Sequence, residues 1–411
     1  MKEETRASQL QSIDRALFSP EYFLDPYPFF HRLRALDPVH RSEPWDCWLV
    51  TRYADVSAAL CDPRFSSSKM SRFTEDLPPA VRENVRPLIL YLSSFMGLSD
   101  QPDHTRLRRF VNKAFVPRVI QGMQERIQAI VDDLLDAVQA EGRMDAIRDF
   151  AYPLPATVIT EMLGLPSGQL EQFKRWSDDI VGFIGAGRAS VDKAEAAQES
   201  VSALTEYYRP IIEDRRRQPR QDLISALATA QDQGDQLSEV EMLATCITLL
   251  AGGYETTTGL IGNGLLALLQ HPTQLRRLQD DPALIPHAIE ELLRYDSPVQ
   301  RAERLTRESV EIDGRTISAG ERVLLVVAAA NRDPAQFPEP DRLDVGRQIK
   351  RHVAFGLGIH FCIGAPLARM EGTVAIETIL RRFPSLGLEE HELAWQENVA
   401  LRVLKRLPVR L

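Results

Sequence analysis

The chain has 411 residues, of which 44% are hydrophobic and 26% are charged, and its formal net charge is -9. This globular composition excludes a disordered chain, and the acidic balance argues against nucleic acid as a general partner because phosphate binding needs a basic surface. No linker-like stretch divides the chain, so we expect a single domain over residues 1–411.

Cysteine usage and the start of the chain predict the compartment. The cysteines are Cys47, Cys61, Cys246 and Cys362, and their wide spacing fits neither a disulfide framework nor a zinc site. Free thiols fit a reducing compartment. The first residues are charged and lack the apolar segment of a signal peptide, and no apolar run is long enough to span a membrane. We therefore expect a cytoplasmic protein without membrane contact.

The first hundred or so residues are mixed in pattern. The segments 38–42 and 45–53 predict short strands, with helical pattern on either side. Residues 65–103 are rich in Pro, Ser and apolar side chains. That stretch predicts either irregular structure around a cavity or a surface hairpin of helices, and the pattern leaves both open.

Helical periodicity dominates residues 104–270. Ser238 and Glu241 have the spacing of a capping box, and His271-Pro272 is a stop signal. The segment between them predicts a helix of roughly thirty residues, long enough to cross the whole domain.

The middle of this long helix is weak. Gly252 and Gly253 each cost about 1 kcal/mol relative to alanine in a helix interior. Threonine hydroxyls bond preceding carbonyls and bend the axis, so we expect a turn that opens to hold a water or a diatomic ligand. Glu255 beside Thr256 places an acid next to a hydroxyl, which suits proton relay. A glycine pair that only packs against another helix is the alternative.

Further elements follow along the chain. A helix over 286–294 places Glu291 and Arg294 on one face. Residues 321–333 predict a buried strand that leads into a loop, and residues 365–382 predict a helix. The β content is minor and is expected in the first and last quarters.

The strongest motif is FGLGIHFCIGAPLAR, Phe355–Arg369. It places Cys362 in a glycine-rich loop that opens directly into a helix. The free amides and the positive dipole end of a helix N-terminus favour a thiolate over a thiol. Glycines allow the tight turns that leave a flat face for a large planar ligand. A nucleophilic or a buried structural cysteine is the alternative.

This motif resembles the haem-binding signature of the cytochrome P-450 superfamily at every defining position, from Phe355 to Gly364. The resemblance implies a mainly α protein with minor β sheets, the cytochrome P-450 fold, with the long central helix over the haem. It implies haem b as cofactor, with Cys362 as the iron ligand. Residues 252–256 match the family's oxygen-activation motif, which makes Thr256 and Glu255 the catalytic pair that delivers protons.

The resemblance also assigns supporting residues. His104 and Arg108 lie one helical turn apart, and arginine pairs well with the carboxylates that haem carries. The full set assigned to haem binding is His104, Arg108, Arg304, Phe355, His360, Cys362, Gly364, Gly252 and Gly253. The structural set, which fixes the loop behind the haem, is Glu291, Arg294 and Arg342.

The expected function is that of a haem-thiolate monooxygenase that hydroxylates or epoxidises a lipophilic small molecule with O2 and two external electrons. A secondary metabolite such as a polyketide, terpenoid, fatty acid or peptide-like product would fit. The expected pocket residues are Leu249, Gln300, Arg301 and Val399. The alternatives are an oxidative coupling enzyme, a haem-thiolate gas sensor and a helical binding protein without haem.

Electrons must come from outside, because the chain has neither a flavin nor a nicotinamide fingerprint. We expect a ferredoxin and a ferredoxin reductase as donors, and a monomeric enzyme. A docking patch is expected at Arg106, Arg109, Lys113 and Arg118, although a solvated basic helix has the same pattern.

Overall fold

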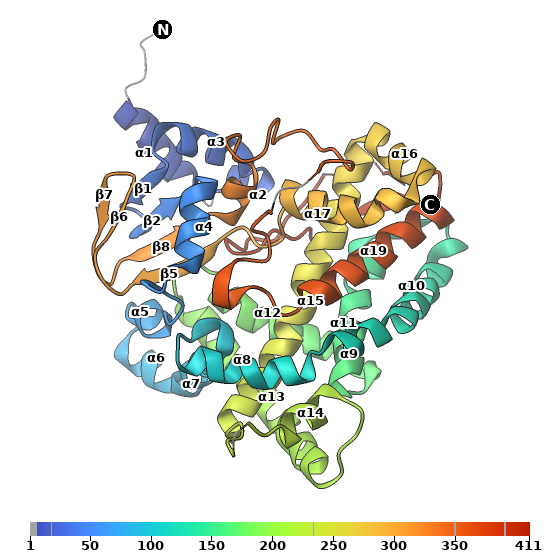
Figure 1. Ribbon diagram of the computed structural model, residues 1–411, viewed down its shortest axis with the longest axis horizontal. Helices are drawn as coiled ribbons and strands as arrows, with labels where there is room; N and C mark the ends of the chain where they lie inside the picture. The colour runs from blue at the N-terminus through green and yellow to red at the C-terminus, as the bar shows by residue number, and fades with distance from the viewer. Residues whose placement is uncertain (1–5, 18, 233, 349–350, 390–391) are drawn as a thin grey trace.

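The computed structural model describes residues 6–17, 19–232, 234–348, 351–389 and 392–411, and Figure 1 shows mostly helices with small sheets at the edges. The α-helices are α1 Arg6–Ala16, α2 Pro20–Leu24, α3 Tyr27–Leu36, α4 Tyr53–Cys61, α5 Met70–Thr74, α6 Pro79–Asn84, α7 Arg86–Ser93, α8 Asp103–Ala114, α9 Pro117–Gly122, α10 Gln124–Gln139, α11 Pro153–Leu163, α12 Leu170–Ile184, α13 Val191–Arg217, α14 Leu223–Thr229, α15 Glu239–Gln270, α16 Pro272–Asp280, α17 Ile285–Tyr295, α18 Val327–Asn331 and α19 Ala365–Arg382. Short 3-10 or π turns are η1 Met96–Leu98, η2 Ile147–Ala151, η3 Ser167–Gln169, η4 Pro282–Leu284 and η5 Gly358–His360. The strands are β1 Val39–Ser42, β2 Cys47–Val50, β3 Phe65–Ser66, β4 Arg143–Asp145, β5 Ala302–Thr306, β6 Val310–Ile312, β7 Arg315–Ile317, β8 Arg322–Leu325, β9 Gly387–Leu388 and β10 Pro408–Arg410.

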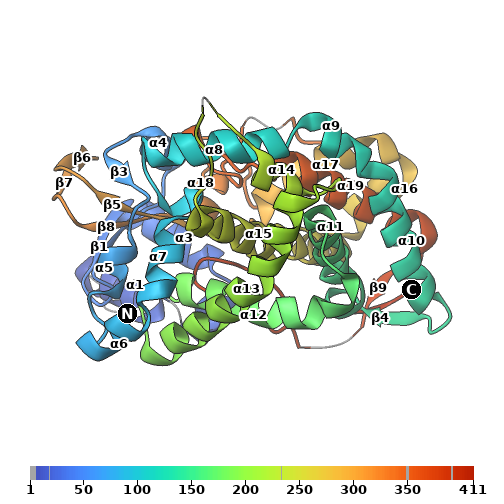
Figure 2. The same cartoon turned by 90° about the horizontal axis from the view of Figure 1, so that it is seen from below.

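Helix α15 is the centre of the fold. The predicted capping box is confirmed: the Glu241 amide donates to the Ser238 hydroxyl at 3.3 Å, and the Ser238 amide donates to the Glu241 carboxylate at 2.8 Å. The helix then runs for 32 residues and packs against α11, α12, α17 and α19. Figure 2 shows α8 and α9 on one side of α15 and α12 and α13 on the other. Most of its residues are buried, as a helix that is apolar all round must be.

The largest sheet has the strand order β1-β2-β8-β5-β3, and only the β2–β8 pair is parallel. The predicted strands at 38–42 and 45–53 are confirmed as the antiparallel pair β1 and β2. Successive side chains of a strand point to opposite faces, so Glu303 and Arg304 of β5 face opposite sides of this sheet. The register pairs Leu305 with Arg322, which places the Arg322 side chain on the Glu303 face.

Some expectations for local structure were wrong. The strand predicted over 321–333 ends at Leu325, and α18 follows because its alanine-rich sequence favours a helix. Strands β4 and β5 lie outside the first and last quarters of the chain. The expected opening of α15 does not break the helix, which is continuous through its glycine pair. Residues 65–103 contain the short helices α5, α6 and α7, but several of their apolar side chains belong to the main buried core, so the stretch is neither irregular nor a surface hairpin.

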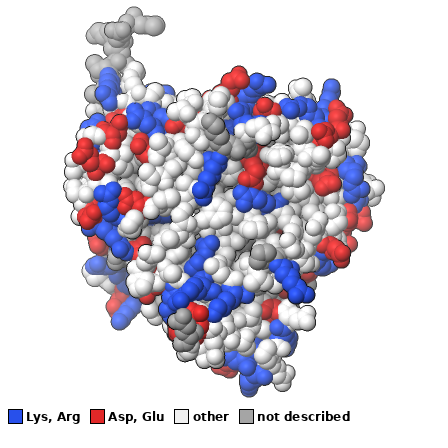
Figure 3. All heavy atoms as spheres, viewed as in Figure 1, with Lys and Arg blue, Asp and Glu red and all other residues white. Residues whose placement is uncertain are grey.

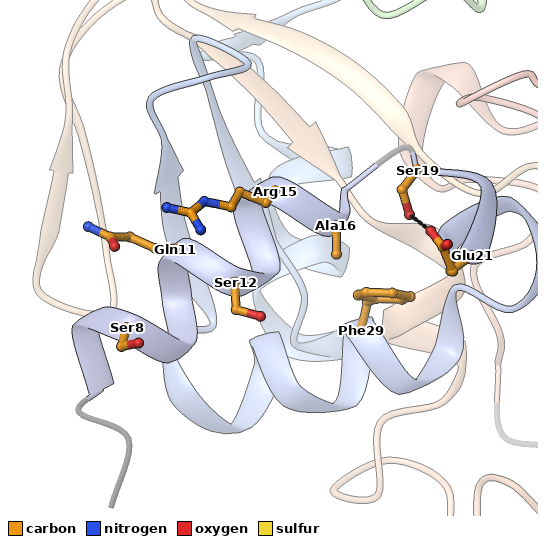
Figure 4. Close-up of a pocket in the computed structure, with 8 residues that line it drawn as sticks. All are labelled: Ser8, Gln11, Ser12, Arg15, Ala16, Ser19, Glu21 and Phe29. Carbon is orange, nitrogen blue, oxygen red and sulfur yellow. Dashed lines mark hydrogen bonds between the residues drawn. The ribbon is translucent and has the colours of Figure 1, made fainter. Parts of the chain in front are cut away.

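A pocket of about 520 Å³ lies against the N-terminal helices α1, α2 and α3, and Figure 4 shows its lining. Its walls are mainly polar, and Ser19 donates a hydrogen bond to Glu21 across one end at 2.7 Å. None of the residues predicted for haem or substrate lines it. Within the described ranges, no helix has the length and apolar character to cross a membrane.

Candidate active site

The shape of the Cys362 loop is set by its glycines and by one backbone hydrogen bond. Gly356 and Gly358 have positive φ values of 69° and 67°, which favour glycine. A Cβ at Gly358 would also lie 3.1 Å from the carbonyl of Leu60 in α4, so the loop packs closely there. The Cys362 amide donates to the carbonyl of Phe355 at 2.9 Å, which closes the loop before α19 begins. The central position of this loop is visible in Figure 1.

The Cys362 thiol lies at the N-terminus of α19. Although the residue keeps accessible surface, the surrounding protein desolvates the thiol and raises its pKa, while the amides of Gly364 and Ala365 and the charge of Arg108 act in the opposite direction. These amides lie at the N-terminus of the helix, whose positive dipole end favours negative charge on sulfur. The amides and Arg108 therefore suit a thiolate. A coordinated metal would deprotonate the thiol outright.

Several residues inside the fold retain accessible surface. Gly252 is exposed although it lies in the middle of α15, and a Cβ added to it would meet no atom within 4 Å. Thr256, one turn further on, is half-buried, and Cys362 is exposed. Since protein interiors are close-packed, accessible surface at these positions fits an internal space for a large ligand.

Four cationic or potentially cationic side chains gather beside the Cys362 loop: His104 and Arg108 from α8, Arg304 from β5 and His360 from η5. The imidazole rings of His104 and His360 lie 4.3 Å apart between centroids. Burial, together with Arg304 and His104, lowers the pKa of His360 to about 3. Burial lowers the pKa of Arg304 to about 10. We call this group the β5 haem-side cluster.

The β5 haem-side cluster lacks anions. Among the described residues, no carboxylate lies within ion-pair distance of its members. The charge of Asp100 acts on the pKa of His360 from a greater distance, but Asp100 already accepts hydrogen bonds from the Ser67 amide at 2.8 Å and from Arg307 at 2.6 Å. The Nδ1 atom of His104 is buried without a hydrogen-bond partner. Two haem propionates would supply the missing negative charge and acceptors, so these residues fit the group.

The acid and the hydroxyl of the α15 motif point to different surroundings. The Thr256 hydroxyl donates to the Gly252 carbonyl at 3.2 Å, on the accessible side of the helix. Glu255 is buried, and one of its carboxyl oxygens has no hydrogen-bond partner. Burial, followed by the charge of Asp178 in α12, raises the pKa of Glu255 to about 8, against the smaller opposing effect of Lys174. A neutral acid next to a hydroxyl has a proton to give near neutral pH.

One predicted haem-binding residue has another role. A Cβ at Gly253 would lie 2.7 Å from the Ile159 side chain, so this glycine allows α15 and α11 to pack closely. This contact concerns one side of Gly253, and its assignment to haem binding stays a prediction. Gly252, which faces open space, keeps that assignment as a prediction.

The predicted structural set also needs a correction. Glu291 and Arg294 are fully buried and form a bidentate pair at 2.7 and 2.8 Å. The third member is Arg347, whose Nε donates to Glu291 at 3.1 Å. The Arg342 side chain is exposed and pairs with Glu339 instead. Arg342 contributes its backbone carbonyl, which accepts from Arg347 at 2.9 Å.

A second ion-pair network behind the loop was missed. Arg369 donates to both oxygens of Glu290 at 2.6 and 2.8 Å, and His352 contacts the same carboxylate at 3.1 Å. Although burial opposes it, these hydrogen bonds hold the pKa of Glu290 at about 2. The Arg369 guanidinium lies 4.6 Å from the centroid of the Phe355 ring. Two successive glutamates, Glu290 and Glu291, could have indicated this second network, since adjacent residues of a helix lie on different faces.

The four predicted pocket residues are all buried. Gln300 donates to the Ser297 carbonyl at 2.7 Å, while its own side-chain oxygen has no partner. Val399 lies 3.2 Å from the Cβ position of Gly187, and Leu249 belongs to the main apolar core.

The predicted docking patch is partly neutralised. Arg106 pairs with Asp235 and Glu241, and Asp232 pairs with Arg109 at 3.1 Å and with Lys113 at 2.9 Å. Arg118 is exposed. Figure 3 nevertheless shows basic side chains gathered over the α8 region of this face, with little acidic surface among them.

Comparisons with known proteins agree with this geometry. The family model for cytochrome P450 matches residues 88–398. The polyketide biosynthesis cytochrome P450 PksS of Bacillus subtilis (strain 168) is 38% identical over 411 residues, covering 97% of this chain and 100% of the relative. The cytochrome P450 monooxygenase PikC of Streptomyces venezuelae is 41% identical over 409 residues, covering 97% of this chain and 94% of the relative. The solved structure of P450BioI in complex with hexadec-9Z-enoic acid ligated acyl carrier protein has a TM-score of 0.89 at 38% identity and covers 96% of this chain and 100% of that one.

The site combines a cysteine at a helix N-terminus with accessible interior surface and a cluster of basic side chains that lacks anions. This combination is typical of haem-thiolate proteins. The chain belongs to the cytochrome P450 family. It has the P450 fold and is a monooxygenase that uses haem b, O2, a redox partner and lipophilic substrates.

Proposed function

We propose that Cys362 is the iron ligand and that this enzyme hydroxylates or epoxidises a lipophilic secondary metabolite, with electrons from a ferredoxin and its reductase. The domain would span residues 1–411 and act as a cytoplasmic monomer. PksS and PikC support the substrate class, because both carry monooxygenase-family names and one is named for polyketide biosynthesis.

The observation that carries the assignment is the β5 haem-side cluster. Gathering four basic side chains, two of them buried and two half-buried, without a counter-anion is unfavourable, and each of their pKa values is lowered accordingly. Two propionates would restore neutrality and accept the unused hydrogen bonds. The same cluster beside an ordinary buried cysteine would have no such compensation.

The bound haem supplies the activation of O2 for transfer of one oxygen atom to the substrate. The chain's own residues provide the surroundings. Thr256 presents a hydroxyl at the accessible face of α15, and Glu255 stores a proton behind it at neutral pH. The Glu290–Arg369 and Glu291–Arg294 pairs fix the segments on either side of the Cys362 loop.

The spectrum of the reduced, CO-bound protein tests the ligand assignment. Wild type should show the red-shifted Soret band of a thiolate-ligated haem, and Cys362→Ser should lose it. Cys61→Ser is the matched control, because Cys61 is also accessible and lies beside Gly358 of the same loop. A wild-type protein without this band would contradict the assignment.

Docking of an acidic ferredoxin is proposed on the α8 surface, where Arg109, Lys113 and Arg118 are the exposed cations. The double variant R109E/K113E should slow the first electron transfer and weaken its dependence on ionic strength, without altering substrate binding. Arg143→Glu is a suitable control, because β4 lies on the opposite side of the molecule from α8 in Figure 2. Unchanged reduction in R109E/K113E would exclude this docking surface.

Product analysis with isotopically labelled O2 distinguishes oxygenation from oxidative coupling. A hydroxylated or epoxidised product carries one labelled atom, whereas a coupled product carries none. Coupling without label would replace the proposed reaction while leaving the family assignment intact.

A further inference from the structure

The buried carboxyl of Glu255 needs a route by which it regains its proton. In the proposed function it gives a proton towards Thr256, so another group must return one before the next turnover. Glu255 is only 5% exposed, and one of its carboxyl oxygens has no hydrogen-bond partner. A group this enclosed exchanges protons with water through its polar neighbours, so those neighbours decide the route.

Two of the surfaces around this turn of α15 do not supply the proton. Towards α11, a Cβ added at Gly253 would lie 2.7 Å from the Ile159 side chain, so the two helices pack closely through apolar atoms. On the accessible side of α15, the Thr256 hydroxyl donates to the Gly252 carbonyl at 3.2 Å. That side receives the proton in the proposed function, so the supply must come from elsewhere.

Helix α12, which also packs against α15, carries an acid and a base beside Glu255. Lys174 and Asp178 lie one turn apart and form an ion pair, and their side chains are 35% and 39% exposed. The buried Tyr254, next to Glu255 in the chain, donates its hydroxyl to Asp178 at 3.1 Å. One oxygen of Asp178 is therefore held from the interior by Tyr254, and the other is held at the surface by Lys174.

The charges of this ion pair act on Glu255. After burial, the charge of Asp178 is the next cause that raises the pKa of Glu255, which reaches about 8, and Lys174 opposes it. A carboxylate beside a second acid favours the protonated form of that acid. Asp178 meets water, whereas Glu255 favours keeping a proton, so this arrangement directs protons from the surface inwards.

The contacts around the ion pair go beyond those of an ordinary surface pair. An ion pair one turn apart on a helix is common and adds little to stability. Here Tyr152 packs edge-on against Tyr254, with ring centroids 5.5 Å apart. The Lys174 ammonium lies 5.4 Å from the centroid of the Tyr152 ring. These aromatic contacts hold in place the two groups that bind the Asp178 carboxylate.

We propose that Asp178 is the solvent-facing entrance through which protons reach Glu255, with Lys174 and Tyr254 as the positioning residues that hold its carboxylate. This inference rests on the proposed monooxygenase function. In each cycle Asp178 takes one proton from water and passes one inwards, and Glu255 accepts it after giving its own proton towards Thr256. Both carboxyl groups return to their starting charge, and one proton has moved from solvent to the accessible face of α15.

Among the described residues, no direct hydrogen bond joins the Asp178 and Glu255 carboxyl groups. A bridging water, or a turn of the Asp178 side chain, completes the transfer between them.

Infrared spectroscopy of the haem-loaded full chain tests the proposal, because a protonated carboxyl absorbs apart from a carboxylate. The Glu255 band is assigned by its loss in Glu255→Gln. After rapid mixing with D2O at about pH 6, where Glu255 keeps its proton, the band shifts as that proton exchanges. Asp178→Asn retains an oxygen for Tyr254 but cannot relay a proton, so it should slow the shift at least about tenfold. Asp178→Glu should restore most of the rate.

Asp179→Asn is the matched control, since it removes the adjacent α12 carboxylate, which accepts from Ser200 of α13 instead. Its exchange rate should equal that of wild type. Turnover in D2O adds a functional readout, because a slower proton supply in Asp178→Asn should enlarge the solvent isotope effect. A role in folding alone would lower Tm and leave the exchange rate unchanged.

Unchanged exchange in Asp178→Asn, or equal slowing in Asp179→Asn, would overturn the proposal. The reduced CO spectrum is recorded on the same samples. A thiolate spectrum with unchanged exchange in Asp178→Asn defeats only the proton entrance. Slowed exchange in a protein without the thiolate spectrum defeats the proposed function alone.

Discussion

Two clusters of basic side chains lie on opposite faces of β5: the β5 haem-side cluster, and a buried group of Lys69, Arg301 and Arg322 around Glu303, here called the outer cluster. The outer cluster surrounds a carboxylate, Glu303, whereas the haem-side cluster has none within ion-pair distance among the described residues. Burial alone would raise the pKa of Glu303, but Lys69, Arg322 and Arg301 outweigh it and lower this pKa to about 2. On the other face, burial lowers the pKa of Arg304 to about 10.

The difference indicates how each cluster is completed. A cluster with an internal carboxylate is partly satisfied by the fold itself and contributes to holding β5, β8 and the α12–α13 turn together. A cluster without one depends on a ligand. Because successive side chains of a strand point to opposite faces, Glu303 and Arg304 belong to different clusters: a stabilising network and the proposed cofactor-binding cluster.

The largest expected effect comes from removing the internal carboxylate. Glu303→Gln leaves three buried cations facing one another, and loss of one partner of a buried ion pair typically costs about 3–5 kcal/mol. Thermal unfolding should show a clear drop in Tm. Glu311→Gln, at an exposed position on β6, should change stability by less than about 0.5 kcal/mol. A Glu303→Gln protein as stable as wild type would mean that the cations relax away from one another.

The haem-side cluster should respond differently to the loss of a charge. Arg304→Gln removes a cation that has no carboxylate partner, so the fold should be little affected while haem binding weakens by about 1.5–3 kcal/mol. Haem transfer to an acceptor protein measures this directly. Arg64→Gln, an exposed arginine paired with Asp62, should leave haem transfer unchanged. Equal transfer rates for wild type and Arg304→Gln would separate Arg304 from the propionates.

Glu255 is a buried glutamate without the cations that surround Glu303, and its pKa shifts in the opposite direction, to about 8. The folded protein therefore holds a proton that the unfolded chain releases above its ordinary pKa near 4.5. Stability should fall as pH rises from about 4.5 to 8, with a slope from this group of at most about 1.4 kcal/mol per pH unit. Tm measured across this range should decline less in Glu255→Gln. Parallel curves for the two proteins would contradict a raised pKa.

The smallest expected effect is at Arg342. Its side chain is exposed and pairs only with exposed Glu339, so Arg342→Ala should change the free energy of unfolding by less than about 0.5 kcal/mol. Arg347→Ala removes a buried bond to Glu291 and should cost about 1–3 kcal/mol. Denaturant unfolding of the two variants compares them, and a larger loss in Arg342→Ala would contradict the role of Arg347 as the third member of the set.

Sequence reasoning was most successful where signals are local. The capping box of α15 and the bounds of α19 were predicted from neighbouring residues, because caps and periodicity depend on short-range contacts. It failed where either of two arginines in one loop could pair with the same glutamate. Arg342 and Arg347 lie five positions apart in one loop, and only the folded path of that loop decides which side chain reaches Glu291.

The sequence by itself determined the class of protein, since a cysteine loop and a helix motif with fixed spacing are read along the chain. It also determined the central helix and the position at which the helix after Cys362 begins. Only the tertiary structure decided the packing at Gly253, which depends on Ile159 of another helix, and the charge excess around Glu303, which depends on Lys69 and Arg322 from distant segments. Motifs record local chemistry, whereas packing and charge balance are sums over residues that only folding brings together.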